Sequence, residues 1–283
     1  MAGRDELREQ LQSPEFVAAL LPDEIKIREK LAEGGQAVVH RGTVGSIDAA
    51  VKVYLPGQEL ERRVEREINA LSNIDCPSLV KLLWSGEVLV SNQLRLSVVA
   101  TEYVDGEVLE QRISRRPLSG DEMGVVAFDV AQAVKAMWAK RIVHRDLKPA
   151  NILIRANGRA CVIDLGVARH LEQSSLTALN STWGTRGYMS PEQARCIRQL
   201  SCKSDLYSLG VILLEAGTGF HPTTRDQFAL MNMVFQRPLP DPVEQWKHAA
   251  LIVQLLQQSP VKRPLPQAVL DLLSTHALRD GGQ

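Results

Sequence analysis

The sequence HRDLKPAN at residues 144–151 decides the fold of this chain and the chemistry it can support. It places the carboxylate of Asp146, the amine of Lys148 and the amide of Asn151 at fixed offsets, in a segment stiffened by one proline. Asp164 follows thirteen residues after Asn151 and opens an Asp-Leu-Gly motif. A base, a cation and two oxygen ligands for a metal are the groups that phosphoryl transfer requires.

These two motifs resemble the catalytic loop, His-Arg-Asp-x-x-x-x-Asn, and the metal motif, Asp-Phe-Gly, of protein kinases. Leu165 is a conservative apolar replacement for the phenylalanine of that metal motif. The resemblance implies that Asp146 orients the attacking hydroxyl as catalytic base and that Lys148 neutralises the transferred γ-phosphate. It implies that Asn151 and Asp164 hold Mg²⁺, a hard cation that prefers oxygen ligands.

The stretch LAEGGQAVV at residues 31–39 lies between two predicted strands and resembles the kinase glycine-rich loop, G-x-G-x-x-G-x-V. Only Gly34 is kept in register, because Ala32 and Ala37 stand where the other two glycines would be. Alanine is small enough for the backbone to approach phosphate but loses access to positive φ, so we expect a stiffer or differently shaped flap. Taken alone, a Gly-Gly turn in a β-hairpin is a common alternative.

Lys52, in Ala-Val-Lys, matches the strand lysine of kinases that contacts the α- and β-phosphates. A snorkelling surface lysine is the alternative, which the offset from the glycine loop disfavours. Glu67 on the next predicted helix matches the glutamate that pairs with this lysine, because Leu71 and Leu82 fall where the family keeps its hydrophobic spine. The Lys52–Glu67 separation is shorter than the family pattern, and a solvated glutamate is the alternative for Glu67.

The stretch TEYV at residues 101–104 resembles the kinase hinge, whose backbone hydrogen-bonds adenine, with Thr101 as a small gatekeeper. Further apolar residues match those that sandwich the adenine ring. The predicted nucleotide-binding residues are Leu31, Gly34, Val39, Ala50, Lys52, Thr101, Glu102, Val104 and Leu153.

Residues 167–192 resemble an activation segment that ends in Ser-Pro-Glu, in place of Ala-Pro-Glu. Just before that end, the resemblance places Thr185 in hydrogen bonds with Asp146 and Lys148. Lys148, two residues after the base, together with Thr185 favours serine or threonine over tyrosine as acceptor. Small-molecule kinases lack such a segment, so a protein substrate is implied. The predicted catalytic residues are Asp146, Lys148, Lys52, Glu67 and Thr185.

Two buried contacts and one switch are implied by the same resemblance. Glu192 is expected to pair with Arg263. Asp205 is expected to hold the catalytic-loop backbone. Arg145, just before the base, is typical of kinases controlled by a phosphate on the activation segment. We expect autophosphorylation there, at Thr177 or Thr182.

Composition sets broad limits on the function. The chain has 283 residues, 45% of them hydrophobic, and its formal net charge is zero. A neutral chain argues against a general nucleic-acid surface. The four cysteines form no C-x-x-C pair, so a structural zinc site is not expected and reduced thiols are. The sequence shows no secretory signal and no apolar run of about 20 residues, which predicts a cytoplasmic chain with no membrane segment.

We therefore expect an α+β fold with the two lobes of a protein kinase. The expected divisions are a helical extension at 1–24, a β-rich N-lobe with one helix at 25–103, a helical C-lobe at 104–275 and a tail at 276–283.

The predicted function is ATP- and Mg²⁺-dependent transfer of phosphate to Ser or Thr of protein substrates. A pseudokinase or nucleotide-binding scaffold is the first alternative, and a phosphotransferase for small molecules is the second. Dimerisation stays open.

Overall fold

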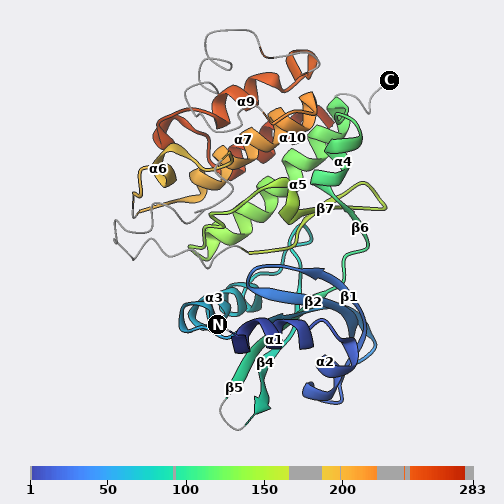
Figure 1. Cartoon of the computed structure of the whole chain (residues 1–283). Helices are drawn as coiled ribbons and strands as arrows, with labels where there is room; N and C mark the ends of the chain where they lie inside the picture. Colours follow the sequence, from blue (N-terminus) through green and yellow to red (C-terminus); the bar gives the residue numbers. More distant parts are fainter. Residues whose placement is uncertain are drawn as a thin grey trace. The chain divides into compact units, whose positions relative to one another are not determined.

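The structure is a computed structural model, and it describes residues 2–91, 94–165, 187–197, 199–221, 239 and 243–277. The chain divides into two compact units (Figure 1). The first unit comprises Met1–Asn73 and Val80–Val104, and the second comprises Ile74–Leu79 and Asp105–Gln283. Within the described ranges, no helix is both long enough and apolar enough to span a bilayer.

The short segment Ile74–Leu79 belongs to the second unit, whereas the sequence prediction placed it in the N-lobe. The carbonyl of Ser78 accepts the amide of Val162 at 2.9 Å, and Leu79 forms an isolated parallel bridge with the same residue. These long-range backbone contacts attach the segment to strand β8 (Ala160–Val162), and the local sequence gives no sign of them.

The first unit is built on a five-stranded antiparallel sheet in the order β1-β2-β3-β5-β4. Its elements are α1 (Ala2–Gln10), α2 (Pro14–Leu20), β1 (Ile25–Glu33), β2 (Ala37–Val44), β3 (Ile47–Tyr54), α3 (Gln58–Ser72), β4 (Leu82–Ser91) and β5 (Leu94–Glu102). Strand β4 runs from Leu82 to Ser91 because it pairs with β5 over its whole length.

The two faces of this sheet carry different partners, as the two-residue period of a strand requires. On β3, Ala49, Val51 and Val53 belong to a core cluster that also contains Leu11 and Val17 of the N-terminal segment. On the opposite face, Ala37, Tyr54 and Val99 of the strands pack with Leu60 and Val64 of α3. Helices α1 and α2 therefore cover one face, and α3 packs on the other (Figure 1).

The N-terminal extension forms two helices rather than one. The first ends at Gln10, and Ser13 caps the second, its hydroxyl accepting the amide of Phe16 at 3.2 Å, with Pro14 at the first helical position. Leu11 and Val17 are completely buried. The extension therefore packs as part of the first unit.

The second unit is mainly helical, with one small three-stranded sheet in the order β6-β7-β8. Its elements are β6 (Gly106–Val108), α4 (Leu109–Arg115), α5 (Gly120–Ala139), η1 (Pro149–Asn151), β7 (Ile152–Arg155), β8, α6 (Pro191–Ala194), α7 (Cys202–Thr218), η4 (Val243–Gln245), α9 (Ala249–Leu255), η5 (Pro260–Lys262) and α10 (Pro266–Ala277).

Helix α7 is the buried axis of the second unit. It packs against α5 and α9, and most of its residues are buried, as its nearly all-apolar sequence predicts. Each end of the helix has a cap. Ser201 caps the start through the amide of Lys203, and Gly219, at a φ of 75°, ends the helix in a left-handed conformation that favours glycine.

Gly217→Ala is expected to destabilise the protein by about 1–3 kcal/mol through overpacking, although alanine is the better helix former. A Cβ at Gly217 would come within 2.4 Å of Cγ2 of Val243 and 2.7 Å of Sδ of Met123. Gly124 in α5 is the matched control because a Cβ there meets nothing within 4 Å. Gly124→Ala should be neutral or stabilise by up to about 1 kcal/mol. Urea unfolding of both variants checks the sign of each change.

Candidate active site

The strand register of the first unit gathers four predicted nucleotide-binding residues on one face of the sheet. Val39 lies opposite Lys52, and Ala50 lies opposite Thr101. Ala50 and Lys52 are two residues apart on β3, so all four side chains project from the same face. This is the face on which α3 packs, opposite the face covered by α1 and α2.

Lys52 and Glu67 form the predicted ion pair, with 3.9 Å between Nζ and Oε1. A closer contact to Glu67 comes from Tyr54, whose hydroxyl donates to Oε2 at 2.6 Å. The Tyr54 ring also lies beneath the ammonium of Lys52, with 5.0 Å from Nζ to the ring centroid. Tyr54 therefore touches both members of the pair. Sequence reasoning missed it, although its place two residues beyond Lys52 on β3 could have indicated it.

Tyr54→Phe is expected to weaken nucleotide binding by about threefold to tenfold, because a hydrogen bond to a charged group contributes about 1 kcal/mol or more. The ring contact with Lys52 is kept, so the change isolates the hydroxyl. Tyr54→Leu removes both contacts and should weaken binding further. Calorimetric titration with an ATP analogue measures the affinity of both variants. An unchanged affinity in Tyr54→Phe would show that the Tyr54 hydroxyl does not support nucleotide binding.

The glycine-loop region is a short turn between β1 and β2. The amide of Gly34 donates to the carbonyl of Ala37 at 2.9 Å, and Ala32 is paired with Val39 in the ladder. None of Ala32, Gly34, Gly35 and Ala37 has a positive φ. Because this turn uses only conformations that any residue adopts, alanine fits at both positions, and a flap of altered shape stays a prediction. Leu31 is 40% exposed on β1.

The predicted hinge leaves the sheet with two of its amides already committed. The amide of Glu102 donates to the carbonyl of Lys81 at 2.8 Å, and that of Tyr103 donates to the carbonyl of Asp48 at 2.9 Å. Val104 is buried, and among the described residues its amide has no backbone acceptor. An uncommitted amide at this position is available to an acceptor on a ligand.

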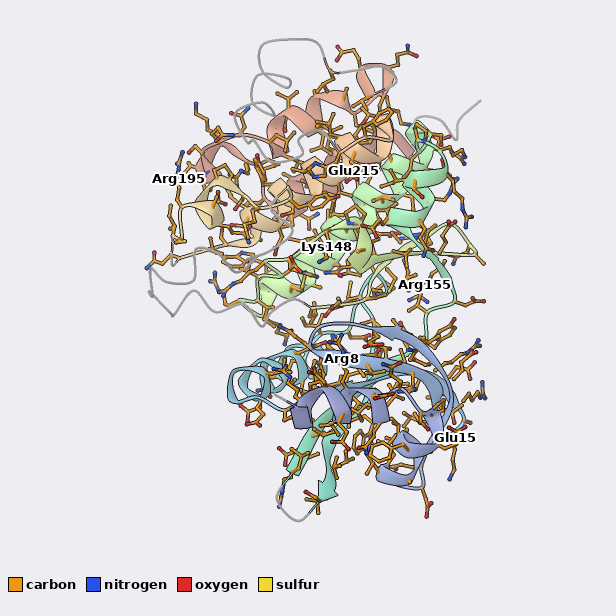
Figure 2. The ribbon with its side chains drawn as sticks, viewed as in Figure 1. Arg8, Glu15, Lys148, Arg155, Arg195 and Glu215 are labelled. Carbon is orange, nitrogen blue, oxygen red and sulfur yellow. The ribbon has the colours of Figure 1, made fainter. Side chains whose placement is uncertain are left out.

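The second unit holds the HRDLKPAN segment in a defined loop. The carboxylate of Asp146 lies 3.2 Å from Nζ of Lys148, which is labelled in Figure 2. Asn151 donates through Nδ2 to the carbonyl of Asp146 at 2.9 Å, so its amide oxygen is the end left to bind a ligand. The loop thus keeps a carboxylate, an ammonium and an amide oxygen close together.

The hairpin β7–β8 sets Asn151 and Asp164 at neighbouring positions. Ile152 pairs with Val162 at the end of the hairpin, and the amide of Ile163 donates to the carbonyl of Asn151 at 3.0 Å. Asp164 is the next residue, so its backbone lies one residue beyond the position opposite Asn151. Two side-chain oxygens of this kind fit Mg²⁺, which binds through one or two carboxylates and keeps several waters. Leu153, predicted to contact adenine, is partly buried on β7.

Two long-range contacts fix the catalytic-loop backbone. Asp205 of α7 accepts the amides of His144 and Arg145, both at 2.9 Å, as the sequence analysis expected. Burial raises the pKa of the Asp205 carboxyl, and the two amide donors and nearby cationic groups oppose that rise. Arg145 has a φ of 68°, an unfavourable value for a residue with a Cβ, which these bonds hold in place.

A second contact to this loop comes from Gln193, which sequence reasoning missed. Its Nε2 donates to the carbonyl of Arg145 at 2.8 Å, while its Oε1 accepts the amide and the hydroxyl of Ser190. The Ser-x-x-Gln spacing is a visible capping box. Its contact with Arg145, 48 residues away in sequence, has no local signal.

The predicted Glu192–Arg263 ion pair is present and bidentate, with N–O distances of 2.6 and 2.8 Å. Both side chains are buried, and Ser204 donates a further hydrogen bond to Glu192 at 2.7 Å. Burial alone would raise the pKa of the Glu192 carboxyl, but the hydrogen bonds from Arg263 and Ser204 outweigh it and lower the pKa. Thr185, Thr177, Thr182 and Gly166 lie outside the described residues.

These features define the class of protein. A five-stranded antiparallel sheet with one packed helix, and a helical unit carrying the HRDLKPAN loop, are the two parts of the α+β protein-kinase fold that the sequence predicted. The chain belongs to the protein kinase domain family, whose model matches residues 25–273.

Bacterial relatives agree with this assignment. The chain is 33% identical over 233 residues to the probable serine/threonine-protein kinase PknB of Lactococcus lactis, covering 79% of this chain and 36% of the relative. It is 30% identical over 275 residues to the serine/threonine-protein kinase PknB of Mycobacterium leprae, covering 91% and 44%. The corresponding identity to PknB of Mycobacterium tuberculosis is 32% over 232 residues, covering 79% and 36%. The chain thus spans less than half the length of these relatives.

Proposed function

We propose that this domain is an ATP- and Mg²⁺-dependent protein kinase that transfers the γ-phosphate of ATP to serine or threonine of protein substrates. The observation that carries the proposal is the constellation in the second unit. There, the carboxylate of Asp146 lies 3.2 Å from Lys148, on a loop held by Asp205 and followed by the oxygen ligands Asn151 and Asp164. The serine/threonine assignment rests on the names of the relatives and on the lysine two residues after the base.

Each unit supplies a set of groups with its own role in this proposal. In the first unit, Lys52 contacts the α- and β-phosphates, Glu67 and Tyr54 orient it, and Val39, Ala50 and Thr101 border the base. The backbone of Glu102 and Val104 hydrogen-bonds the adenine, Leu31 covers it, and Gly34 opens the loop over the phosphates.

In the second unit, Asp146 accepts or aligns the proton of the acceptor hydroxyl, and Lys148 balances charge on the transferred phosphoryl group. Asn151 and Asp164 would hold Mg²⁺, which supplies charge neutralisation on the phosphate oxygens when bound. Thr185 hydrogen-bonds Asp146 and Lys148 in the same proposal. Because phosphoryl transfer has a loose transition state, the protein contributes mainly by positioning these groups, and the fixed loop backbone suits that task.

Regulation and cellular setting belong to the same proposal. Phosphorylation of Thr177 or Thr182 would provide a negative charge for Arg145. The acceptors are proteins, without a nucleic-acid partner, and the reaction takes place in the cytoplasm, where ATP is available.

The test is incubation of the purified chain with labelled ATP, Mg²⁺ and a generic basic protein, followed by phosphoamino-acid analysis. We expect phosphoserine or phosphothreonine on the acceptor or on the chain itself, and none when Mg²⁺ is removed with EDTA. Phosphotyrosine alone would contradict the acceptor assignment. If no phosphate is transferred while a nucleotide analogue still raises the melting temperature, the proposal of an active kinase is contradicted and a nucleotide-binding scaffold is favoured.

A further inference from the structure

The N-terminal helix reaches the glycine-loop turn through one side chain. Arg8 of α1, labelled in Figure 2, donates from Nε to Oε1 of Glu33 at 2.7 Å and from Nη2 to the carbonyl of Gly34 at 3.0 Å. Glu33 ends β1 and Gly34 begins the turn. The two hydrogen bonds from Arg8 therefore join the N-terminal extension to the last residue of β1 and to the first residue of the turn.

The helix that carries Arg8 is fixed to the sheet close to this contact. The carbonyl of Leu11 accepts a hydrogen bond from Nε2 of the buried His40 on β2 at 2.8 Å. The amide oxygen of Gln12 accepts from Nζ of Lys30 on β1 at 3.0 Å. Leu7 and Leu11 are buried in the core. Since these anchors hold α1 on β1 and β2, the position of Arg8 is set relative to the turn between the same strands.

The contact with Gly34 has a direct effect on the direction of the backbone. In a planar trans peptide the carbonyl and the following N–H point in opposite directions. Because the carbonyl of Gly34 is turned toward Arg8, the amide of Gly35 points away from it. Backbone amides of this loop are the groups that cover the phosphates in kinases. No residue from Ala32 to Ala37 has a positive φ, so a glycine-specific conformation does not fix this peptide.

We propose that Arg8 is a positioning residue for the phosphate-binding turn, and that the N-terminal extension sets the affinity for the nucleotide through it. This inference rests on the proposed function. The Arg8–Glu33 pair is partly exposed, with side-chain exposures of 35% and 27%, so it contributes little to global stability. Its effect is on the order and direction of the turn.

The test compares Arg8→Met, Arg8→Lys and Arg95→Met in the full chain. Arg95 forms an exposed pair with Glu87 on the same sheet, so Arg95→Met is a matched control for the loss of an arginine–glutamate contact. Hydrogen–deuterium exchange over residues 31–37 is measured without nucleotide. Binding of a non-hydrolysable ATP analogue with Mg²⁺ is measured by calorimetry.

We expect Arg8→Met to accelerate exchange in the turn and to raise the dissociation constant by about two- to fivefold, with the melting temperature nearly unchanged. Arg8→Lys should be intermediate, because an ammonium lacks the planar fork that serves both acceptors. Unchanged exchange and affinity in Arg8→Met would overturn the proposal, as would an equal change in Arg95→Met. If Arg8→Met alters exchange but the wild-type chain binds no nucleotide, the proposed function fails and the Arg8–turn contact stands.

Discussion

Asp146→Asn is expected to lower the rate of phosphoryl transfer by about 10²- to 10⁴-fold, the usual contribution of a positioned base. The substitution keeps the shape of the side chain and removes its negative charge. It therefore removes the proton acceptor and the ion pair with Lys148, whose Nζ lies 3.2 Å from the carboxylate. The loop should keep its conformation, because Asn151 bonds the backbone carbonyl of Asp146 and Asp205 bonds the amides of the preceding residues.

The expected signature is a loss of rate without a loss of binding. Single-turnover transfer from labelled ATP measures the rate, and calorimetry with an ATP analogue measures the dissociation constant, which should not change. Asp121→Asn is the control, because Asp121 is an exposed carboxylate in the first turn of α5. A rate within tenfold of the wild-type rate in Asp146→Asn would mean that this carboxylate is not the base.

The sequence predicted best those features whose geometry is fixed by neighbouring residues. The offsets among Asp146, Lys148 and Asn151 lie within one tight loop, so their spacing nearly determines their arrangement. The pairing of Lys52 with Glu67 was also predictable, because the helix places one glutamate at the correct offset from apolar neighbours.

Contacts between distant segments were predictable only where the family resemblance specified both partners, as for Glu192 with Arg263. The contacts of Gln193 with Arg145 and of Arg8 with Gly34 could not be predicted in this way. Gln193 lies in a capping box and Arg8 in an amphipathic helix, and only tertiary packing brings each side chain to its distant partner. The shape of the glycine loop could not be derived from the residue types alone. Replacing two glycines by Ala32 and Ala37 excludes positive φ without fixing which ordinary conformation the turn adopts.

Removing one partner of the Glu192–Arg263 pair is expected to lower the free energy of unfolding by about 3–5 kcal/mol, because the other charge stays buried without its counter-ion. Arg263→Met should cost more than Glu192→Gln. Arg263 also donates to the carbonyls of Lys203, Gln257 and Gln258, which the substitution leaves without this donor. Urea unfolding followed by circular dichroism measures the change.

Two further variants separate the buried pair from ordinary surface charge. The double variant Glu192→Met with Arg263→Met should be less destabilised than the sum of the single changes, because it leaves no unpaired charge. Arg115→Met, which breaks a pair between an exposed arginine and the partly buried Glu107 in the same unit, should cost at most about 1 kcal/mol. A cost for Glu192→Gln as small as that of Arg115→Met would contradict the assigned importance of the pair.

The pair should also make stability depend on pH in one direction. The hydrogen bonds from Arg263 and Ser204, which outweigh the opposing effect of burial, hold the pKa of Glu192 in the folded protein below its ordinary value of 4.5. As the pH falls, the Glu192 carboxyl therefore takes up a proton in the unfolded chain before it does so in the folded protein. The stabilisation that the ionised carboxylate gives above a pH of about 4.5 is progressively lost below it. Glu192→Gln lacks this titrating group. Its stability should approach that of the wild-type protein as the pH is lowered from about 6 to about 3.5, and a constant difference across that range would show that the Glu192 carboxylate is not the source.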